Sequence, residues 1–586
     1  MIDELGFEEF SAKVRSLEHA GQINEALDAY RLWLRKNPNL PVSFAIWFEY
    51  GRTLLLSGSL YQAENAFKAV LEQKPDFPEA LMGLGSALEA QGKIDEAIST
   101  WQGGLRSEDI RVGFLNNIAR VSDGRFSHEQ TESVLLQSLY IKPGQPEVLS
   151  TLLNVRQKLC QWPIFTKELP VSIEAQKEII GPLASLALVD DPISNLESAK
   201  RFIKLKQYEG NFKPLLKKTH RYAGHKKIRL GFVSSDFRLH ATSIFYVQLL
   251  EKLNRDHFEV YGFDITTINF EGDYMRPRLL QALDHHIDLR ALSDEHAANK
   301  IQELEIDVLI DLTGLTSSAR PGIILRRPAP IQVAYLGFIA SSAISTVDYV
   351  ITTPDLFKGA DAGFTEKPLF LSGVFATIDD QSPKVAHLTR QSQSLPENAF
   401  VFCALLNPYK ITQSVYESWM RILVATPGSV LWLIADTEKQ KQNLIDYAKG
   451  FDVNADRLIF TSRIQPSEYR ASLGLADLFL DTAPYGNGAT AHDAIVANLP
   501  MLTCPGNTMM SRLTAHFMRA MALDDLVATS WADYEARAID LASNPEKLVA
   551  YRQAILDARK SSAVFNQAAF AEDFGRAILG LMRSTK

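Results

Sequence analysis

The sequence predicts an α-helical repeat region followed by two α/β lobes built on parallel sheets. Three observations predict this class: a 34-residue repeat near the N-terminus, short apolar runs alternating with amphipathic stretches after residue 227, and the grouping of those runs into two series of about five. At 586 residues the chain is too long for one core, since single cores stop growing at roughly 250–300 residues. Several domains are therefore expected.

Composition places the chain among ordinary globular proteins, with 46% hydrophobic and 22% charged residues. The net charge of −8 argues against a general nucleic-acid binder, which needs a basic face. The three cysteines are far apart and match neither a disulfide framework nor a metal site. Neither a signal peptide nor a membrane-length apolar run is evident. We expect a cytoplasmic protein with no membrane partner and no bound metal.

The repeated pattern occurs at residues 21–38, 58–75 and 92–109. Gly58 and Gly92 are 34 residues apart, as are Ala63 and Ala97. This period, with Gly at the turn between helices, Ala on the packing face and Pro after the second helix, is the tetratricopeptide (TPR) signature. Glycine supplies the tight turn, and proline ends the helix.

A degenerate fourth copy is expected from Gly124 to Pro143, so the repeat domain is placed at 1–150. Such repeats can serve as a structural platform, but their concave surface usually docks a protein, which we favour here. Residues 151–226 lose the period and are interpreted as a helical linker. The basic stretch 213–227 is a solvated face without an assigned function.

The apolar runs after residue 227 predict buried strands. The first series is 228–235, 258–264, 308–314, 331–338 and 347–353; the second is 400–406, 429–435, 457–463, 478–483 and 500–506. Helical patterns between the runs favour parallel sheets covered by helices on both faces. The two series place one lobe at 227–390 and the other at 391–586. Ligands of such sheets bind at the carboxyl ends of the strands, so the loops after strands are the candidate sites.

Two of these loops carry isolated chemical groups. The loop 234–243 has His240 at its tip; taken alone, a loop histidine is more often structural than functional. In the loop 405–411, Lys410 follows a strand and is expected to open a helix. A cation beside helix N-terminal amides would form an anion site, although an isolated lysine is weak evidence.

A third loop, 481–494, is rich in glycine. Gly486 and Gly488 permit close backbone approach, and Thr490 is expected to cap the next helix. Asp493, expected in the first turn of that helix, could complement the helix dipole or accept a sugar hydroxyl. The loop fits a nucleotide, but Asn-Gly pairs also mark plain turns.

A fourth loop, 504–512, leads into a helix that contains Arg512. The sequence contains no G-x-G-x-x-G fingerprint and no Walker motif, which disfavours a dehydrogenase or an NTPase. It also contains no Asp-x-Asp triplet, so a metal-clamped diphosphate is not indicated.

After the TPR-type repeats, several blocks follow in a distinctive order: IRLGFVSSDFRLHATS, RRPAPIQVAYLG, LLNPYKI, GSVLWLIA, ADLFLDTAPYGNGATAHDA and PGNTMMSRL. In this order the chain resembles the O-GlcNAc transferase family, glycosyltransferase family 41, from about residue 228 to its end. The stretches 160–165 and 185–192 are similar to the linker of bacterial members. The resemblance implies a GT-B fold, with two Rossmann-like lobes and the active site in the cleft between them.

The resemblance also implies metal-independent, inverting transfer of a sugar to a Ser or Thr hydroxyl of a protein, with no cofactor besides the nucleotide-sugar. Lys410 resembles the lysine that neutralises the leaving diphosphate, and Asn407 stands where Gln or Asn contacts the phosphates. Asp493 resembles the ribose-binding aspartate, and Thr490 the last Thr of a His-Thr-Thr triplet. His240 resembles the active-site histidine, which positions groups or handles a proton.

The chain departs from the family on the donor side. The His-Thr-Thr triplet is Gly488-Ala489-Thr490 here, so the ring that stacks on uracil is absent, and His492 is a candidate substitute. The Pro-Gly-Thr-Ser-Gly segment reads Ile-Ala-Ser-Ser-Ala at 339–343. UDP-GlcNAc is the default donor. Relatives with this architecture use other donors, among them GDP-fucose, and bacterial members modify flagellin with nonulosonic acids, which makes a CMP-linked donor the main rival and flagellin a candidate acceptor.

Two further interpretations stay open. The chain could be a TPR adaptor with an inactive GT-B unit, although the presence of Lys410, Asn407, Asp493 and His240 favours an active enzyme. It could also transfer sugar to Asn side chains or to a glycan, although related Asn-modifying enzymes generally lack TPR repeats.

Overall fold

The computed structural model describes residues 5–38, 40–122, 125–205, 212–267, 272–379, 381 and 387–584. The chain forms two compact units. Unit 1 comprises Met1–Val155 with Thr166–Gln176, and unit 2 comprises Arg156–Phe165 with Lys177–Lys586. Gly124, where the fourth repeat was expected to begin, lies outside the described residues.

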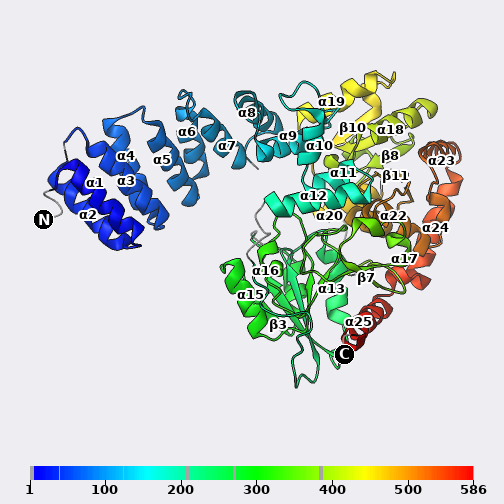
Figure 1. Ribbon diagram of the computed structural model, residues 1–586. Coiled ribbons are helices and arrows are strands. Elements are labelled where there is room, and N and C mark those ends of the chain that lie inside the picture. The colour runs from blue at the N-terminus through cyan, green and yellow to red at the C-terminus, as the bar shows by residue number, and fades with distance from the viewer. Residues whose placement is uncertain are drawn as a thin grey trace. The chain divides into compact units, whose positions relative to one another are not determined.

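Unit 1 contains successive antiparallel helix pairs, drawn in blue in Figure 1. Its helices are α1 (Phe7–His19), α2 (Ile23–Lys36), α3 (Ser43–Leu56), α4 (Leu60–Gln73), α5 (Pro78–Ala90), α6 (Ile94–Gly104), α7 (Arg111–Arg120) and α8 (His128–Ile141). Gly58 and Gly92 adopt φ values of 78° and 80° between paired helices, a left-handed conformation that favours glycine. Ala63 and Ala97 are fully buried. The predicted repeat is therefore confirmed.

Four further helices lie between the repeats and the first sheet in the sequence. They are α9 (Pro146–Lys158), α10 (Ile173–Ile179), α11 (Pro182–Leu188) and α12 (Pro192–Leu205). The end of α9 belongs to unit 2, where the Gln157 amide donates to the Tyr409 carbonyl at 2.6 Å.

The first lobe is a parallel sheet whose seven described strands run in the order β3-β2-β1-β4-β5-β6-β7. The strands are β1 (Ile228–Ser234), β2 (Phe258–Asp264), β3 (His285–Asp288), β4 (Val308–Asp311), β5 (Ile331–Ala334), β6 (Tyr349–Thr352) and β7 (Lys367–Phe370). Its helices are α13 (Ser243–Lys252), α14 (Met275–Gln281), α15 (Asp294–Glu303), α16 (Pro321–Leu325) and α17 (Pro354–Phe357). The prediction of five strands was wrong at the two edges: β3 (HHID) has no apolar run and is largely exposed, and β7 (KPLF) has a short apolar run that is only partly buried.

The second lobe is a parallel sheet of five described strands in the order β10-β9-β8-β11-β12. They are β8 (Val401–Ala404), β9 (Val430–Ile434), β10 (Leu458–Thr461), β11 (Leu478–Leu480) and β12 (Met501–Leu502). The helices are α18 (Gln413–Ala425), α19 (Glu438–Lys449), α20 (Pro466–Leu473), α21 (Ala489–Val496), α22 (Met509–Ala520), α23 (Trp531–Ser543), α24 (Glu546–Ser561) and α25 (Gln567–Ser584). The last helix, α25, packs against α13 of the first lobe (Figure 1).

Both sheets have the doubly wound order, in which the first strand of the lobe lies between strands that follow it on either side. Ligands of such sheets bind where the strand order reverses. The reversal lies between β1 and β4 in the first lobe, and between β8 and β11 in the second. In the described part of the chain, no helix has the length and apolar character needed to span a bilayer.

Candidate functional site

The loops after β8 and β11 meet at the strand-order reversal of the second lobe. The loop after β8 ends in a 3-10 turn, Pro408–Lys410, and α18 begins only at Gln413, capped by Thr412. The prediction that Lys410 opens a helix was therefore wrong. The lysine is instead the last residue of the turn and is buried, with 8% of its surface exposed.

Lys410 is held by groups from the loop after β11. Its Nζ donates to Oδ1 of Asn487 at 2.9 Å and lies 4.9 Å from the ring centroid of Tyr485. Burial lowers the pKa of Lys410 to about 8, while the charge of Asp481 opposes that shift. The ammonium therefore lies in a confined place with a neutral amide and an aromatic face as its nearest partners.

The loop after β11 is itself fixed by polar contacts. Nδ2 of Asn487 donates to Oδ1 of Asp481 at 2.6 Å, and Thr503 donates to Oδ2 at 2.6 Å. The backbone N–H of Asn487 donates to the Thr514 hydroxyl at 3.0 Å, and that hydroxyl lies 3.1 Å from the Asn487 carbonyl. A Cβ on Gly486 would lie 2.7 Å from the Met510 carbonyl, so glycine is required there for close packing within the lobe.

The glycine-rich loop leads into α21, but its residues take other helix positions than predicted. Gly488 is the N-cap, and Thr490 is the second helical residue and not a cap. Asp493 lies in the second turn of α21, not the first. The Thr490 hydroxyl hydrogen-bonds Tyr469, whose hydroxyl also donates to the Leu405 carbonyl after β8. The two loops are thus tied together through α20.

Asp493 is held by two donors on one carboxylate oxygen. Nε of Arg470 lies 2.7 Å from its Oδ1, and Nδ1 of His492 lies 3.1 Å from the same atom. Burial opposes ionisation, but the hydrogen bond from His492 and the charge of Arg470 outweigh it and lower the pKa of Asp493. The carboxylate is therefore charged and able to accept a further hydroxyl.

His492 does not replace the missing stacking ring. Its side chain is completely buried, and its Nε2 accepts the backbone N–H of Asp379 at 3.1 Å. Because Nε2 accepts, Nδ1 carries the proton that points to Asp493. The ring packs edge to face against Phe245 of the first lobe, 5.6 Å between centroids. The suggestion that His492 could take over base stacking was therefore wrong.

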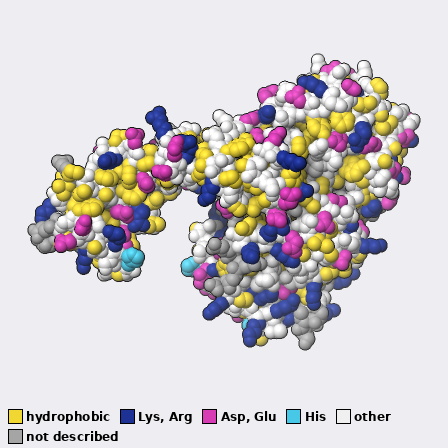
Figure 2. Space-filling model, turned by 45° about the horizontal axis from the view of Figure 1, so that its top comes forward, with side chains coloured by type: hydrophobic (Ala, Val, Ile, Leu, Met, Phe, Trp, Pro, Cys, Tyr) yellow, Lys and Arg dark blue, Asp and Glu magenta, His cyan; other side chains and the backbone are white. Residues whose placement is uncertain are grey.

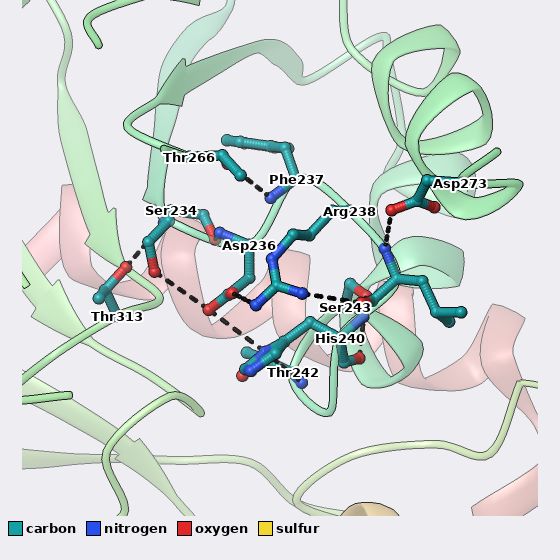
Figure 3. Close-up of polar contacts among 12 residues, drawn as sticks. Ser234, Asp236, Phe237, Arg238, His240, Thr242, Ser243, Thr266, Asp273 and Thr313 are labelled. Carbon is teal, nitrogen blue, oxygen red and sulfur yellow. Dashed lines mark hydrogen bonds and ion pairs between the residues drawn. The ribbon is translucent and has the colours of Figure 1, made fainter. Parts of the chain in front are cut away.

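His240 lies in the loop after β1, at the strand-order reversal of the first lobe (Figure 3). Its Nδ1 lies 3.2 Å from Oδ2 of Asp236 and 3.3 Å from the backbone N of Thr242. These contacts need opposite protonation of Nδ1. We favour a proton directed at Asp236, because hydrogen bonds to a carboxylate are roughly twice as strong as neutral ones. Nε2 is then free to accept a proton.

Burial lowers the pKa of His240, against the effect of Asp236 and together with that of Arg238. The imidazole is thus neutral at physiological pH. The loop that carries His240 leads directly into α13. Phe245 on α13 lies beside the glycine-rich loop, since a Cβ on Gly488 would be 3.8 Å from Cε2 of Phe245. The histidine loop and the glycine-rich loop therefore border the same region of unit 2.

The other predicted positions, Asn407 and the segment 339–343, are either exposed or bonded to neighbouring side chains of the same lobe. Asn407 is exposed and caps the 3-10 turn through its side chain. In the segment 339–343, the hydroxyls of Ser341 and Ser342 donate to the buried carboxylate of Glu366 at 2.6 and 2.8 Å. These serines therefore hold the first lobe together.

Arg512 lies within α22, as predicted, and braces the loop before that helix. Its Nε donates to the Gly506 carbonyl at 2.9 Å, and its NH1 donates to the Lys358 carbonyl of the first lobe. The structure thus gives this arginine structural partners. In the described residues, no group of three or more His, Cys, Asp or Glu side chains is arranged to hold a metal ion.

Unit 1 contains a groove of about 890 Å³. The apolar lining side chains include Phe48, Leu55, Phe67, Met82 and Val112. Exposed charges of both signs border it: the carboxylates of Glu79, Glu108 and Asp109 and the cations of Arg52 and Lys142. A Cβ on Gly83 would lie 2.4 Å from the Phe67 ring, so glycine lets that ring fill the floor of the groove. Hydrophobic side chains also gather over unit 1 on the face shown in Figure 2.

Sequence reasoning missed the partners of its candidate residues. Asp481, Asn487 and Tyr485 all stand in the glycine-rich loop, but only its glycines, Thr490 and Asp493 were singled out. A signal was present: Asp481 directly follows an apolar strand, where a carboxylate is close to any ligand of the sheet. Nothing local distinguished Arg470, which lies within the amphipathic α20.

Comparison with known proteins finds one family over most of the chain. Residues 206–392 and 372–574 match the model of glycosyl transferase family 41, and residues 57–103 match a tetratricopeptide repeat model. The O-GlcNAc transferase of Thermobaculum terrenum, solved as a Lys-to-Met mutant, has a similar fold, with a TM-score of 0.67 at 22% identity. That match covers 92% of this chain and 98% of the other.

Two curated relatives match this chain over only part of their own length. The chain is 28% identical over 448 residues to the probable UDP-N-acetylglucosamine–peptide N-acetylglucosaminyltransferase SEC of Arabidopsis thaliana, covering 72% of this chain and 46% of that protein. It is 24% identical over 464 residues to the UDP-N-acetylglucosamine–peptide N-acetylglucosaminyltransferase of Caenorhabditis elegans, covering 59% and 40%. The chain thus spans less than half the length of these two relatives.

Proposed function

The chain belongs to glycosyl transferase family 41, and from that premise we propose that it is an active protein O-glycosyltransferase. It transfers a sugar from a nucleotide-sugar to a Ser or Thr hydroxyl of a protein docked on the helical repeats. The transfer inverts the anomeric carbon and uses no metal ion. The observation that carries the proposal is the buried ammonium of Lys410 at the strand-order reversal of the second lobe.

The proposed reaction is a single displacement. The acceptor hydroxyl oxygen attacks the anomeric carbon from the face opposite the phosphate, and a new C–O glycosidic bond forms. The bond between that carbon and the phosphate oxygen breaks, and the nucleotide leaves with the electron pair. The hydroxyl proton is released to a base near the acceptor, for which the free Nε2 of the neutral His240 is suited.

Lys410 provides the electrostatic part of this mechanism. Negative charge grows on the phosphate oxygens as the bond breaks, and a preorganised cation in a dry site stabilises such charge most. Lys410 fits this role because it is buried, and because its contacts with the Asn487 amide and the Tyr485 ring are with neutral groups that do not neutralise its charge. Asp493 is suited to hold a ribose hydroxyl, since Arg470 and His492 both contact Oδ1 and leave the second carboxylate oxygen to accept.

The groove of unit 1 supports docking of the acceptor protein. Its apolar lining would bury apolar side chains of an acceptor segment, while its three bordering carboxylates and two bordering cations would pair with charged side chains of either sign. Docking raises the local concentration of the acceptor hydroxyl near the catalytic unit. The acceptor identity, flagellin included, is a proposal that rests on the architecture alone.

The identity of the donor is proposed from the names of the curated relatives and from the residues around Gly488. UDP-GlcNAc is the default, since the curated relatives are named for it. Gly488 offers no ring to stack on uracil, and Leu513 and Phe245 lie beside it, which weakens the case for UDP, so a CMP-nonulosonic acid is the second candidate. The alternative to an enzyme is an adaptor protein with an inactive catalytic unit. Such a protein would give the buried Lys410 no function.

Donor turnover by the purified protein tests the proposal. An active enzyme should slowly hydrolyse its nucleotide-sugar without acceptor and should add one or more sugar masses to a co-encoded acceptor protein in intact-mass spectra. Lys410→Ala should abolish both. An adaptor should bind that protein but turn over none of UDP-GlcNAc, GDP-fucose and a CMP-nonulosonic acid.

A further inference from the structure

We propose that Asp481 and Asn487 are positioning residues that hold the Lys410 ammonium in its charged form and direct it at the departing phosphate. This inference rests on the proposed function. It is carried by a continuous, buried chain of contacts from Asp481 through Asn487 to Lys410.

Asn487 is locked in place before any ligand arrives. The residue is fully buried, and its backbone N–H and carbonyl both contact the Thr514 hydroxyl on α22. Its side chain bridges Asp481 and Lys410 with distances of 2.6 and 2.9 Å. Because the amide nitrogen, the amide oxygen and the backbone of Asn487 are all bonded, the residue loses little further conformational entropy when a ligand binds, as preorganisation requires.

Asp481 decides which way the amide of Asn487 points. An ionised carboxylate only accepts hydrogen bonds, so it takes the NH2 group of Asn487 and leaves Oδ1 for the ammonium. Its other oxygen accepts from Thr503 at 2.6 Å, and Thr514 is a further hydrogen-bond partner of the carboxylate. Burial raises the pKa of Asp481, and the hydrogen bonds from Thr503, Thr514 and Asn487 oppose that shift. The Tyr534 hydroxyl donates to the backbone carbonyl of Asp481 at 3.1 Å and fixes the main chain as well.

The neutral amide between the two charges has a chemical consequence. A direct ion pair would neutralise the ammonium, whereas a relay through Asn487 lets the field of Asp481 stabilise the charge at a distance. Among the described residues, the Tyr485 ring lies under Nζ of Lys410, and Tyr409, on the same turn as the lysine, packs against that ring. Burial raises the pKa of both phenols, so they stay neutral. Asp481 therefore opposes the effect of burial on the lysine.

The test is the pH dependence of ligand binding by the full chain, measured by calorimetry with UDP and with inorganic pyrophosphate. For the unmodified protein, binding should weaken above about pH 8, as Lys410 loses its proton. Asp481→Asn keeps the size of the side chain but removes its charge. The midpoint of this loss should then fall by about one pH unit, the size typical of losing one nearby opposite charge. Binding should be about fivefold weaker at pH 8 and within twofold at pH 6.

Asp477→Asn is the matched control. Asp477 lies directly before β11, whereas Asp481 lies directly after it, and the carboxylate of Asp477 pairs with Arg390 at 2.8 Å. It should leave the midpoint unchanged. Asn487→Ala should lower the midpoint in the same direction as Asp481→Asn, which provides a second route if one variant folds poorly. In a Lys410→Arg background the alkaline loss should vanish, because arginine stays protonated, and Asp481→Asn should then have no pH effect.

The outcomes separate this inference from the proposed function. An unshifted midpoint in both Asp481→Asn and Asn487→Ala would overturn the positioning role, even in a fully active enzyme. Shifted midpoints in a protein that transfers no sugar would support the positioning role and contradict the enzymatic proposal. Failure of the unmodified protein to bind either probe at pH 6 to 7 would overturn the positioning role, whereas sugar transfer from a GDP- or CMP-linked donor would leave the proposed function standing.

Discussion

The Nζ of Lys410 lies 2.9 Å from Oδ1 of Asn487, which joins the loops that follow two neighbouring strands of the second lobe. The two residues are 77 positions apart in the sequence. Their contact fixes an ammonium where the carboxyl ends of β8 and β11 meet, which is the usual ligand position of a doubly wound sheet. The predictions below follow from this cation and from the groups around it.

Lys410→Ala should nearly abolish sugar transfer while leaving the fold intact. Removing one preorganised electrostatic group typically costs about 10²–10³ in rate. Lys410→Arg should rescue only part of this loss, because its planar fork does not match the place of a compact ammonium. Transfer rates and melting curves of both variants check the prediction. An alanine variant within threefold of the unmodified rate would contradict the assignment.

The pH profile of kcat/KM should be bell-shaped. Because burial lowers the pKa of Lys410 to about 8, the free enzyme holds the ammonium below that pH and loses it above. On the acid side, activity should fall as His240 gains a proton, at a pH below the ordinary histidine range because burial lowers its pKa. The alkaline limb of kcat should lie higher, since a bound phosphate favours the charged lysine. Steady-state rates from pH 5 to 9.5 check these limbs.

Leu55→Glu should weaken modification of the protein acceptor far more than donor hydrolysis. Leu55 lines the groove of unit 1, so a carboxylate there would repel an apolar segment. Leu56→Glu is the matched control, since the adjacent Leu56 is 77% exposed and is not among the groove residues. Rates on the protein acceptor and on a short peptide from its modification site measure the difference.

This comparison is cleaner than deleting residues 1–150, which would cut within α9 (Pro146–Lys158) and remove part of a helix whose end contacts the catalytic unit. Equal losses on protein and peptide acceptors in Leu55→Glu would mean that the repeats are only structural.

Restoring the family triplet with Gly488→His and Ala489→Thr should strengthen UDP binding. Stacking of a nucleic-acid base on an aromatic side chain is typically worth about 1–3 kcal/mol. A Cβ at position 488 would lie 3.3 Å from Cδ2 of Leu513, so Leu513→Ala should be added to make room. Calorimetry with UDP, CMP and GDP decides the matter, with Leu513→Ala alone as the control. Tight and selective UDP binding by the unmodified protein would show that the missing ring is compensated.

Asp493→Asn should weaken nucleotide binding but spare the binding of pyrophosphate, because the carboxylate is expected to hold the ribose. Arg470→Ala should have a smaller effect in the same direction, since it frees Oδ1 of Asp493 without removing the acceptor. Binding of UDP and of 2′,3′-dideoxy-UDP checks the assignment: the Asn variant should no longer distinguish the two. If Asp493→Asn discriminates as well as the unmodified protein does, the ribose assignment is wrong.

Local patterns in the sequence were sufficient for the repeats, for the βα alternation and for the central strands of both sheets. Each of these depends on residues within one helix or strand, where apolar spacing reports directly on the buried face. The edge strand β3 was missed because it buries little side-chain surface and has no apolar run, and β7 was missed although it has a short apolar run, which is only partly buried. Helix starts were misplaced at Lys410 and at Thr490 because a 3-10 turn and a glycine cap carry no strong sequence signal.

The sequence by itself determined which loops could hold a ligand, because strand ends and glycines are local features. Only the tertiary structure decided how those loops work. The bridge from Asp481 through Asn487 to Lys410 and the hydrogen bond from Asp379 to His492 join residues far apart in the chain. They assign His492 to the buried support of Asp493 and not to the nucleotide. The physical reason is burial: a polar side chain removed from water must find a partner, and packing of the two lobes determines which partners are within reach.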